Sequence, residues 1–170
     1  MPRIPFDELP GNARVWIFSA SRPLSPAERE RVLAEADAFA DQWAAHGVPL
    51  TAARDLRYDR FVMIGVDEES AGVSGCSIDA LTRRMRQLEG ALGLELVNNA
   101  PVHYRDGQEI ARVSRERFGE LAEAGAVTVD SVVFDNTVAT VGDLRAGRWE
   151  VPAGQAWHRR AFFSTSPVRS

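Results

Sequence analysis

The single cysteine of the chain is the side chain with the clearest potential for chemistry. Cys76 lies in the string Ser74 to Asp79, where an apolar strand predicted over 61–66 gives way to a helix predicted over 77–92. A thiol at a helix start faces free backbone N–H groups and the positive end of the helix dipole, which lower its pKa and favour the nucleophilic thiolate. The sequence therefore predicts a candidate thiol site at this strand-to-helix junction.

His46 could supply the base that such a thiol needs. It lies at the end of the first predicted helix, and the predicted topology brings that end to the sheet edge where the second helix begins. Cys76 would then be the nucleophile, His46 its base and Asp79 the group that orients the imidazole. Trp43, one turn before His46, would form an apolar wall. This arrangement predicts a cysteine-dependent hydrolase or transferase.

A binding site without catalysis explains the same residues in another way. Lone cysteines are often small buried apolar side chains, Ser74 or Ser77 is an ordinary helix cap, and a histidine before Gly47 is a common helix end. The helix start at Ser74, Gly75 and Ser77 would suit an anion or a carboxylate. We therefore favour a non-enzymatic binding module for a small ligand or a protein partner, with the cysteine enzyme as the alternative.

Trp157 and His158 are a second candidate site. An aromatic pair so late in the chain either packs back on the protein or is presented to a partner. An indole buries a large apolar area, which favours packing. We keep both residues as candidate ligand-binding groups.

The composition excludes several classes of function. The formal net charge of -4 argues against a general nucleic-acid binder. One cysteine and three separated histidines give no zinc signature, so we expect neither a metal nor another cofactor. No apolar run reaches the roughly 18 residues of a membrane span, and the first residues lack the apolar stretch of a signal peptide. We therefore expect a cytoplasmic protein without a membrane partner.

The order of the predicted elements indicates an α+β fold. The predicted strands cover 13–19, 50–57, 61–66 and about 94–97, and the predicted helices cover about 25–46 and 77–92. This β-α-β-β-α-β order is that of a ferredoxin-like sheet, with the first and third strands at its centre. We expect this domain over 1–100, a small α+β appendage packed on it over 101–163, and a disordered tail over 164–170.

The first and third predicted strands are apolar on both faces. Two helices can cover only one face of the sheet, and the other face cannot remain in water. We expect the C-terminal appendage or a second copy of the chain to cover it, so a homodimer is a possible assembly.

Several strings resemble a family of small uncharacterised bacterial proteins, some of which carry the label "ABC transporter ATPase": Asn12 to Phe18, Gln42 to Gly47, Ser74 to Asp79, and Trp149 to Pro152 with Trp157 and His158. The resemblance implies no established activity. An ATPase of the labelled class needs the loop GxxxxGK[ST], whose lysine reaches the phosphates. All 20 basic residues of this chain are arginines, which excludes ATP hydrolysis by that mechanism.

The second part of the chain is similar to the small GYF-like modules of bacterial adapter proteins. The similarity lies in Tyr104 to Gly107, Val113 to Glu116, and the later Val133, Phe134 and Trp149. It implies a peptide-docking appendage. The chain departs from those modules in the longer segment between Phe134 and Trp149.

Overall fold

The computed structural model describes residues 4–42, 44–45, 48–49, 51–67 and 75–163, with the backbone alone for 44–45, 48–49 and 75–77. The predicted α+β class is confirmed, and the strands pair antiparallel. The chain divides into two units, Met1–Asn98 with Ala139–Gly142, and Asn99–Val138 with Asp143–Ser170. The predicted packing of the appendage on the first domain stays a prediction, and the tail 164–170 lies outside the described residues.

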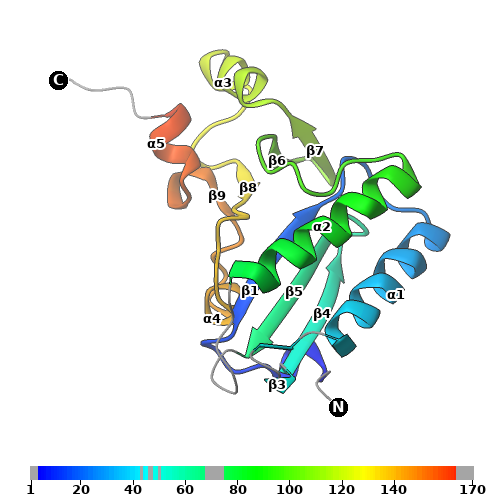
Figure 1. Cartoon of the computed structure of the whole chain (residues 1–170). Helices are drawn as coiled ribbons and strands as arrows, with labels where there is room; N and C mark the ends of the chain where they lie inside the picture. The colour runs from blue at the N-terminus through cyan, green and yellow to red at the C-terminus, as the bar shows by residue number, and fades with distance from the viewer. Residues whose placement is uncertain (1–3, 43, 46–47, 50, 68–74, 164–170) are drawn as a thin grey trace. The chain divides into compact units, whose positions relative to one another are not determined.

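The first unit is a sheet with two helices on one face (Figure 1). Its strands have the order β1-β5-β4. In chain order, the elements are η1 (Phe6–Glu8), β1 (Arg14–Ser19), α1 (Pro26–Gln42), β2 (Ala44–Ala45), β3 (Val48–Pro49), β4 (Thr51–Arg57), β5 (Phe61–Asp67) and α2 (Gly75–Leu92). The short β2 and β3 pair only with each other among the described strands.

The start of α1 is fixed by a capping box, for which Ser25 and Glu28 have the required residue types and spacing. Glu28 N–H donates to the Ser25 hydroxyl at 3.2 Å, and Ser25 N–H donates to the Glu28 carboxylate at 2.9 Å. The helix then buries its apolar face against α2 and the sheet. The members of this core include Val32, Ala36, Phe39, Leu81, Met85, Leu88, Val62, Ile64 and Val66.

The predicted fourth strand, about Leu94 to Val97, was wrong. The amides of Leu96 and Val97 donate to the Glu89 carboxylate at 2.7 and 2.8 Å, so they are not available for a strand ladder. Leu94 and Leu96 are nevertheless buried in the core.

The predicted central position of the first strand was also not observed. β5 lies between β1 and β4. The backbone of the segment 139–142 forms hydrogen bonds with the outer edge of β1. Val15 N–H donates to the Ala139 carbonyl at 2.9 Å, and Val141 N–H donates to the Ala13 carbonyl at 2.9 Å. A segment far along the chain therefore occupies the edge that we assigned to a local strand.

The second face of the sheet is covered beside β4 by the N-terminal segment. The cluster there consists of buried Leu9, Ala13, Ala53 and Val141, with Ile4 and Phe6 packed against it. Gly65 in β5 makes room for this segment, because a Cβ there would overlap Leu9 Cδ1 and lie 3.2 Å from Phe6 Cε2. N-terminal residues therefore cover part of this face, which we expected the C-terminal appendage or a second copy of the chain to cover.

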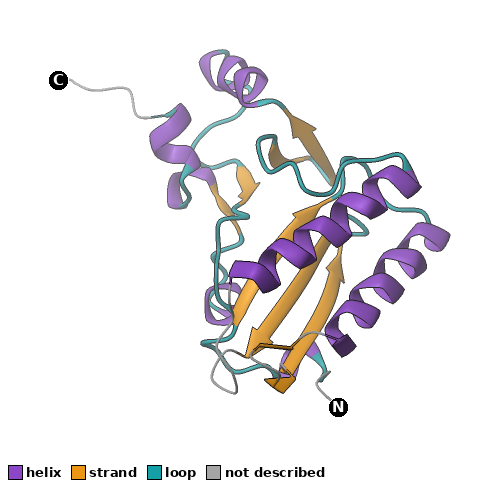
Figure 2. Ribbon diagram, viewed as in Figure 1, coloured by secondary structure: helices purple, strands orange, loops and turns teal. Residues whose placement is uncertain are grey.

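The second unit has a four-stranded sheet of order β7-β6-β8-β9 (Figure 2). Its elements are β6 (Val102–Asp106), β7 (Glu109–Val113), α3 (Arg115–Glu123), β8 (Val132–Phe134), β9 (Glu150–Pro152), η3 (Ala153–Gln155) and α5 (His158–Phe162). The short α4 (Val141–Arg145) contains Val141 and Gly142, which belong to the first unit.

The hairpin and the longest helix of the second unit form where local sequence signals favour them. The hairpin β6–β7 turns at Asp106 and Gly107, where Gly107 has a φ of 66° that favours glycine. The helix α3 begins after Ser114, whose hydroxyl accepts the amide of Arg117 at 3.0 Å. The unit has its own core around Phe118, which includes Tyr104 and Val133.

Candidate functional site

The predicted thiol site lies mostly outside the described residues. Trp43, His46 and Ser74 are not described, so the predicted proximity of His46 and Cys76 stays a prediction. The helix α2 begins at Gly75, two residues earlier than predicted. The backbone of Cys76 and Ser77 therefore lies in the first helical turn.

Asp79, the predicted orienting group, is exposed on α2. Because the helix begins at Gly75, Asp79 is the fifth helical residue and falls beyond the first turn. The interaction of a carboxylate with the helix dipole declines beyond that turn. Asp79 therefore gains little from the helix dipole.

Trp157 and His158 lie together at the start of α5 in the second unit. Their rings stack, with centroids 4.0 Å apart, but their exposure differs. Trp157 is half-buried, whereas His158 is 1% exposed. A ligand at the surface would meet the indole of Trp157, and the imidazole would support that indole from the core.

The support beneath Trp157 is an aromatic cluster centred on Phe118. Phe118 is fully buried, and its ring centroid lies 4.9 Å from that of Phe162, 5.5 Å from that of Tyr104 and 6.1 Å from that of His158. Edge-to-face contacts of this kind add about 0.5–1.5 kcal/mol each to the burial of the rings. Trp157 is therefore held on a packed platform.

The pKa of His158 is lowered to about 4 by this environment. Burial is the largest cause, and it is opposed by the charge of Asp135 and assisted by that of Arg115. Nδ1 of His158 is buried without a hydrogen-bond partner among the described residues. The imidazole is consequently neutral at pH 7 and adds no cation to the site.

Guanidinium groups gather around Trp157. The Cζ atom of Arg115 lies 4.8 Å from the centroid of the indole ring, and Arg115 Nε donates to the Ala100 carbonyl at 3.0 Å. Arg159 and Arg160 are exposed in α5. Together with Trp157 they line a hollow of about 460 Å³. We call Arg115, Trp157, Arg159 and Arg160 the Trp157 site.

The arginines of the Trp157 site differ from many others in the chain. Elsewhere guanidinium groups form ion pairs, as Arg105 does with Glu150 and Arg117 does with Glu120. Within the part of the chain that the structure describes, Arg115, Arg159 and Arg160 form no ion pair. The site therefore concentrates positive charge on a chain whose formal net charge is -4.

This arrangement can bind an anion beside a flat group. A guanidinium presents several N–H donors in a plane and matches a carboxylate or a phosphate, and the exposed part of the indole offers an apolar contact to a ring beside it. No group of three His, Cys, Asp or Glu side chains that could hold a metal ion occurs among the described residues. In the same described part of the chain, no helix has the length and apolarity to cross a bilayer.

Sequence reasoning found part of the Trp157 site. Trp157 and His158 were predicted as ligand-binding groups, but Arg115 was missed. Arg115 follows the helix cap Ser114, and no local pattern shows that a residue there will meet an indole 42 positions later. Comparisons with models of protein families, with curated proteins and with solved structures find no match to this chain.

Proposed function

We propose that the chain is a non-enzymatic binding module whose second unit binds a carboxylate- or phosphate-bearing ligand at the Trp157 site. The observation that supports this proposal is the gathering of guanidinium groups around a half-buried indole, without carboxylate partners among the described residues. Positive charge that the protein does not neutralise itself is available to a ligand. The first unit is proposed as a ferredoxin-like core in which the segment 139–142 takes the place of the fourth strand.

The contacts available at the site set the expected affinity. Exposed ion pairs contribute about 0.2–1 kcal/mol each, and a ring contact with an indole contributes about 0.5–1.5 kcal/mol. Two ion pairs and one ring contact sum to at most about 3.5 kcal/mol, which corresponds to a Kd of about 3 millimolar or weaker for a small ligand. A protein segment that carries the same anion could bind more tightly, because it would bury more surface.

The experiment is a titration of the full chain with phenyl phosphate and with inorganic phosphate, observed through the Trp157 indole N–H signal in NMR. The signal is assigned by its absence in Trp157→Phe. We expect saturable shifts with both probes and at least threefold tighter binding of phenyl phosphate, because only that probe carries a ring. An acidic peptide forms a third arm and distinguishes a protein segment from a small ligand.

The matched control for this titration is Arg117→Ala. Arg159→Ala combined with Arg160→Ala should weaken phenyl phosphate binding at least fivefold, while Arg117→Ala, an exposed arginine on α3, should leave it within twofold. Equal losses in both variants would show that only the net charge matters. That result, or shifts that never saturate, would overturn the proposal.

A cysteine-dependent hydrolase or transferase is the second candidate function. It is supported by the start of α2 at Gly75, which places the backbone of Cys76 in the first helical turn. A thiol at that position would gain from the helix dipole. The thiol pKa tests this candidate.

A further inference from the structure

Beyond Ala52 the outer edge of β4 pairs with no strand among the residues that the structure describes. β4 is an edge strand of the sheet, and Ile4 N–H donates to the Ala52 carbonyl at 3.0 Å on the side away from β5. Backbone groups in an antiparallel ladder point alternately toward one neighbour and then the other. The register of β4 and β5 is continuous from Thr51 to Arg57, so Arg54 and Leu56 also direct their backbone groups outward.

These outward groups have different partners. Leu56 N–H donates to the carboxylate of its neighbour Asp55 at 2.9 Å. The N–H and C=O of Arg54 meet no backbone partner among the residues that the structure describes. An edge strand with such groups is a template for an additional strand.

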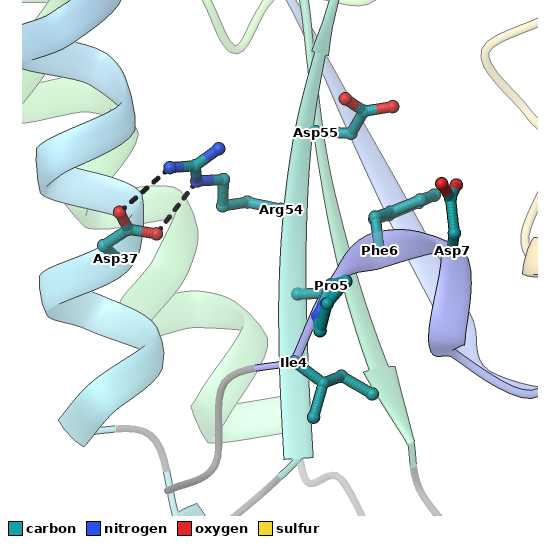
Figure 3. A pocket seen from close by; sticks show the side chains of 8 residues that line it. Ile4, Pro5, Phe6, Asp7, Asp37, Arg54 and Asp55 are labelled. Atoms are coloured by element: carbon teal, nitrogen blue, oxygen red, sulfur yellow. Dashed lines mark hydrogen bonds and ion pairs between the residues drawn. The ribbon is translucent and has the colours of Figure 1, made fainter.

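The N-terminal segment leaves this edge because of its sequence. Pro5 has no N–H to donate, and its φ of -59° and ψ of 142° direct the chain into η1. The departing segment and β4 enclose a hollow of about 600 Å³, lined by Ile4, Pro5, Phe6, Asp7, Asp37, Ala53, Arg54 and Asp55 (Figure 3). The open edge of Arg54 therefore borders a space that can hold an extended chain.

The side chains around this edge are already ordered. Arg54 points to α1, where its Nε and one terminal nitrogen donate to Asp37 at 2.9 and 3.2 Å (Figure 3). Asp55 points to the opposite face and accepts Arg57 Nε at 3.0 Å. The hollow is lined by the three carboxylates of Asp7, Asp37 and Asp55 and by the guanidinium of Arg54, and a carboxylate can accept further donors.

We propose that an extended peptide segment of a partner protein, carrying a basic side chain, adds as a strand to the outer edge of β4 at Arg54. The backbone groups of Arg54 would pair with the peptide. The basic side chain would face Asp55 and Asp7, and an apolar side chain two positions along the peptide, on the same face of the added strand, would contact the half-buried Ile4 and Phe6. This site belongs to the first unit and does not depend on the Trp157 site.

A second copy of the chain fits this edge less well. Two β4 strands that pair antiparallel about Arg54 would place guanidinium opposite guanidinium. Pairing about Asp55 would place carboxylate opposite carboxylate. Like charges directly opposite each other destabilise a strand pair. A basic peptide avoids both arrangements.

The test follows the Arg54 amide of the full chain by hydrogen exchange, using as the probe the blocked peptide acetyl-VTKTV-amide, whose lysine and valines share one face of the strand. In the free protein the Arg54 amide should exchange faster than those of Ala53 and Asp55, which point to β5. Millimolar peptide should slow Arg54 exchange at least threefold. The peptide with glutamate in place of lysine should protect it less, and a peptide with N-methyl groups along its pairing edge should not protect it.

The variants separate backbone pairing from side-chain effects. Arg54→Pro removes the outward N–H, which an edge strand tolerates, and it should abolish peptide-induced NMR shifts. Arg54→Ala keeps the N–H and should retain the peptide-induced NMR shifts that Arg54→Pro loses. Asp55→Asn should weaken binding at least twofold, whereas Glu30→Gln, an exposed carboxylate on α1, should not. If Arg54→Pro fails to fold, the N-methylated peptide still provides the test.

Three results would overturn the proposal. The first is an Arg54 amide that is already as slow as its neighbours in the free chain. The second is equal protection by the N-methylated and the unmodified peptide. The third is protection that grows with protein concentration in the absence of peptide, because that would identify a second copy as the occupant.

Discussion

The indole of Trp157 stacks on the imidazole of His158, with ring centroids 4.0 Å apart and planes inclined by 28°. The two neighbours in sequence thus have opposite environments, one half-buried at a hollow and the other in the core. The neutral imidazole under the indole keeps the positive charge of the Trp157 site on its arginines. The stability of this platform should therefore depend on the protonation of His158.

Acidification from pH 6.5 to pH 4 should destabilise the protein through His158. Its pKa is lowered to about 4, chiefly by burial, while the unfolded chain takes up the proton near pH 6.5. Between these values the unfolded state binds more protons, so the free energy of unfolding falls as the pH falls. The loss is on the order of 2–3 kcal/mol at most and levels off below pH 4.

The measurement is urea unfolding at pH 7, 6, 5 and 4 for the unaltered chain and for His158→Leu. Carboxylates that titrate in the same range are common to both proteins, so the difference between the two pH profiles reports His158. The leucine variant should lose less stability on acidification. Parallel profiles would contradict a buried, neutral imidazole.

The cap of α1 should contribute to the stability of the first unit. Ser25→Ala removes the hydroxyl that accepts Glu28 N–H, and such a change costs about 1 kcal/mol. Thermal unfolding followed by circular dichroism should show a lower Tm. Ser21→Ala is not a neutral control, because its hydroxyl accepts Glu95 N–H. Ser114→Ala removes the equivalent cap of α3 and should give a loss of similar size.

The same capping box has an acid dependence. The pKa of Glu28 is lowered to about 2, first by the hydrogen bond from Arg22 and then by that from the Ser25 amide. A lowered pKa means that the stabilisation is complete above the ordinary carboxyl pKa and is lost as the pH falls toward 2. Glu28→Gln should therefore reduce the dependence of Tm on pH between 4.5 and 2. An unchanged dependence would show that the box does not form.

The capping box and the missed fourth strand show what sequence reasoning can reach. Ser25 and Glu28 interact over three positions, so their types and spacing were sufficient to predict the cap. The segment from Leu94 to Val97 has the composition of a strand. Two of its backbone amides, however, donate hydrogen bonds to the Glu89 carboxylate, and the segment 139–142 forms the backbone hydrogen bonds along the outer edge of β1. Both effects depend on groups outside the predicted strand. Local sequence patterns therefore predict helices and strands, whereas tertiary contacts determine which segments lie side by side in the sheet.

In the candidate sites, too, the local sequence predicts some features and tertiary contacts determine the others. Trp157 was selected because a late indole must either pack or be presented, and the structure gives it both a packed face and an exposed part. For the edge at Arg54, the sequence predicts only that β4 is a charged edge strand and does not predict the hollow beside it. Its hollow depends on where Pro5 turns the N-terminal segment away, and this requires the tertiary contact between Ile4 and Ala52.

Two glycines of the first unit should respond oppositely to alanine. A Cβ at Gly142 would lie 2.9 Å from the carbonyl oxygen of Gly11, which accepts the Gly142 amide at 2.7 Å. Gly142→Ala must therefore shift the backbone at the edge of β1, and we expect a loss of about 1–3 kcal/mol. A Cβ at Gly90 in α2 would meet nothing within 4 Å, so Gly90→Ala should gain about 0.5–1 kcal/mol. Urea unfolding of both variants tests the pair, and equal effects would contradict the close approach at Gly142.

The Cys76 thiol tests the candidate cysteine enzyme. If the first turn of α2 activates the sulfur, the pKa of the thiol lies below its ordinary value of about 8.5. The rate of alkylation by iodoacetamide, measured on the folded chain from pH 5 to 10 by mass spectrometry, gives this pKa, and Cys76→Ser supplies the blank. The cysteine enzyme further requires that His46→Ala raises the pKa, because a protonated imidazole nearby stabilises the thiolate. The binding module at the Trp157 site sets no condition on this thiol. A thiol pKa that His46→Ala leaves unchanged would contradict the cysteine enzyme, and a pKa near neutral that responds to His46 would establish a paired nucleophile and base.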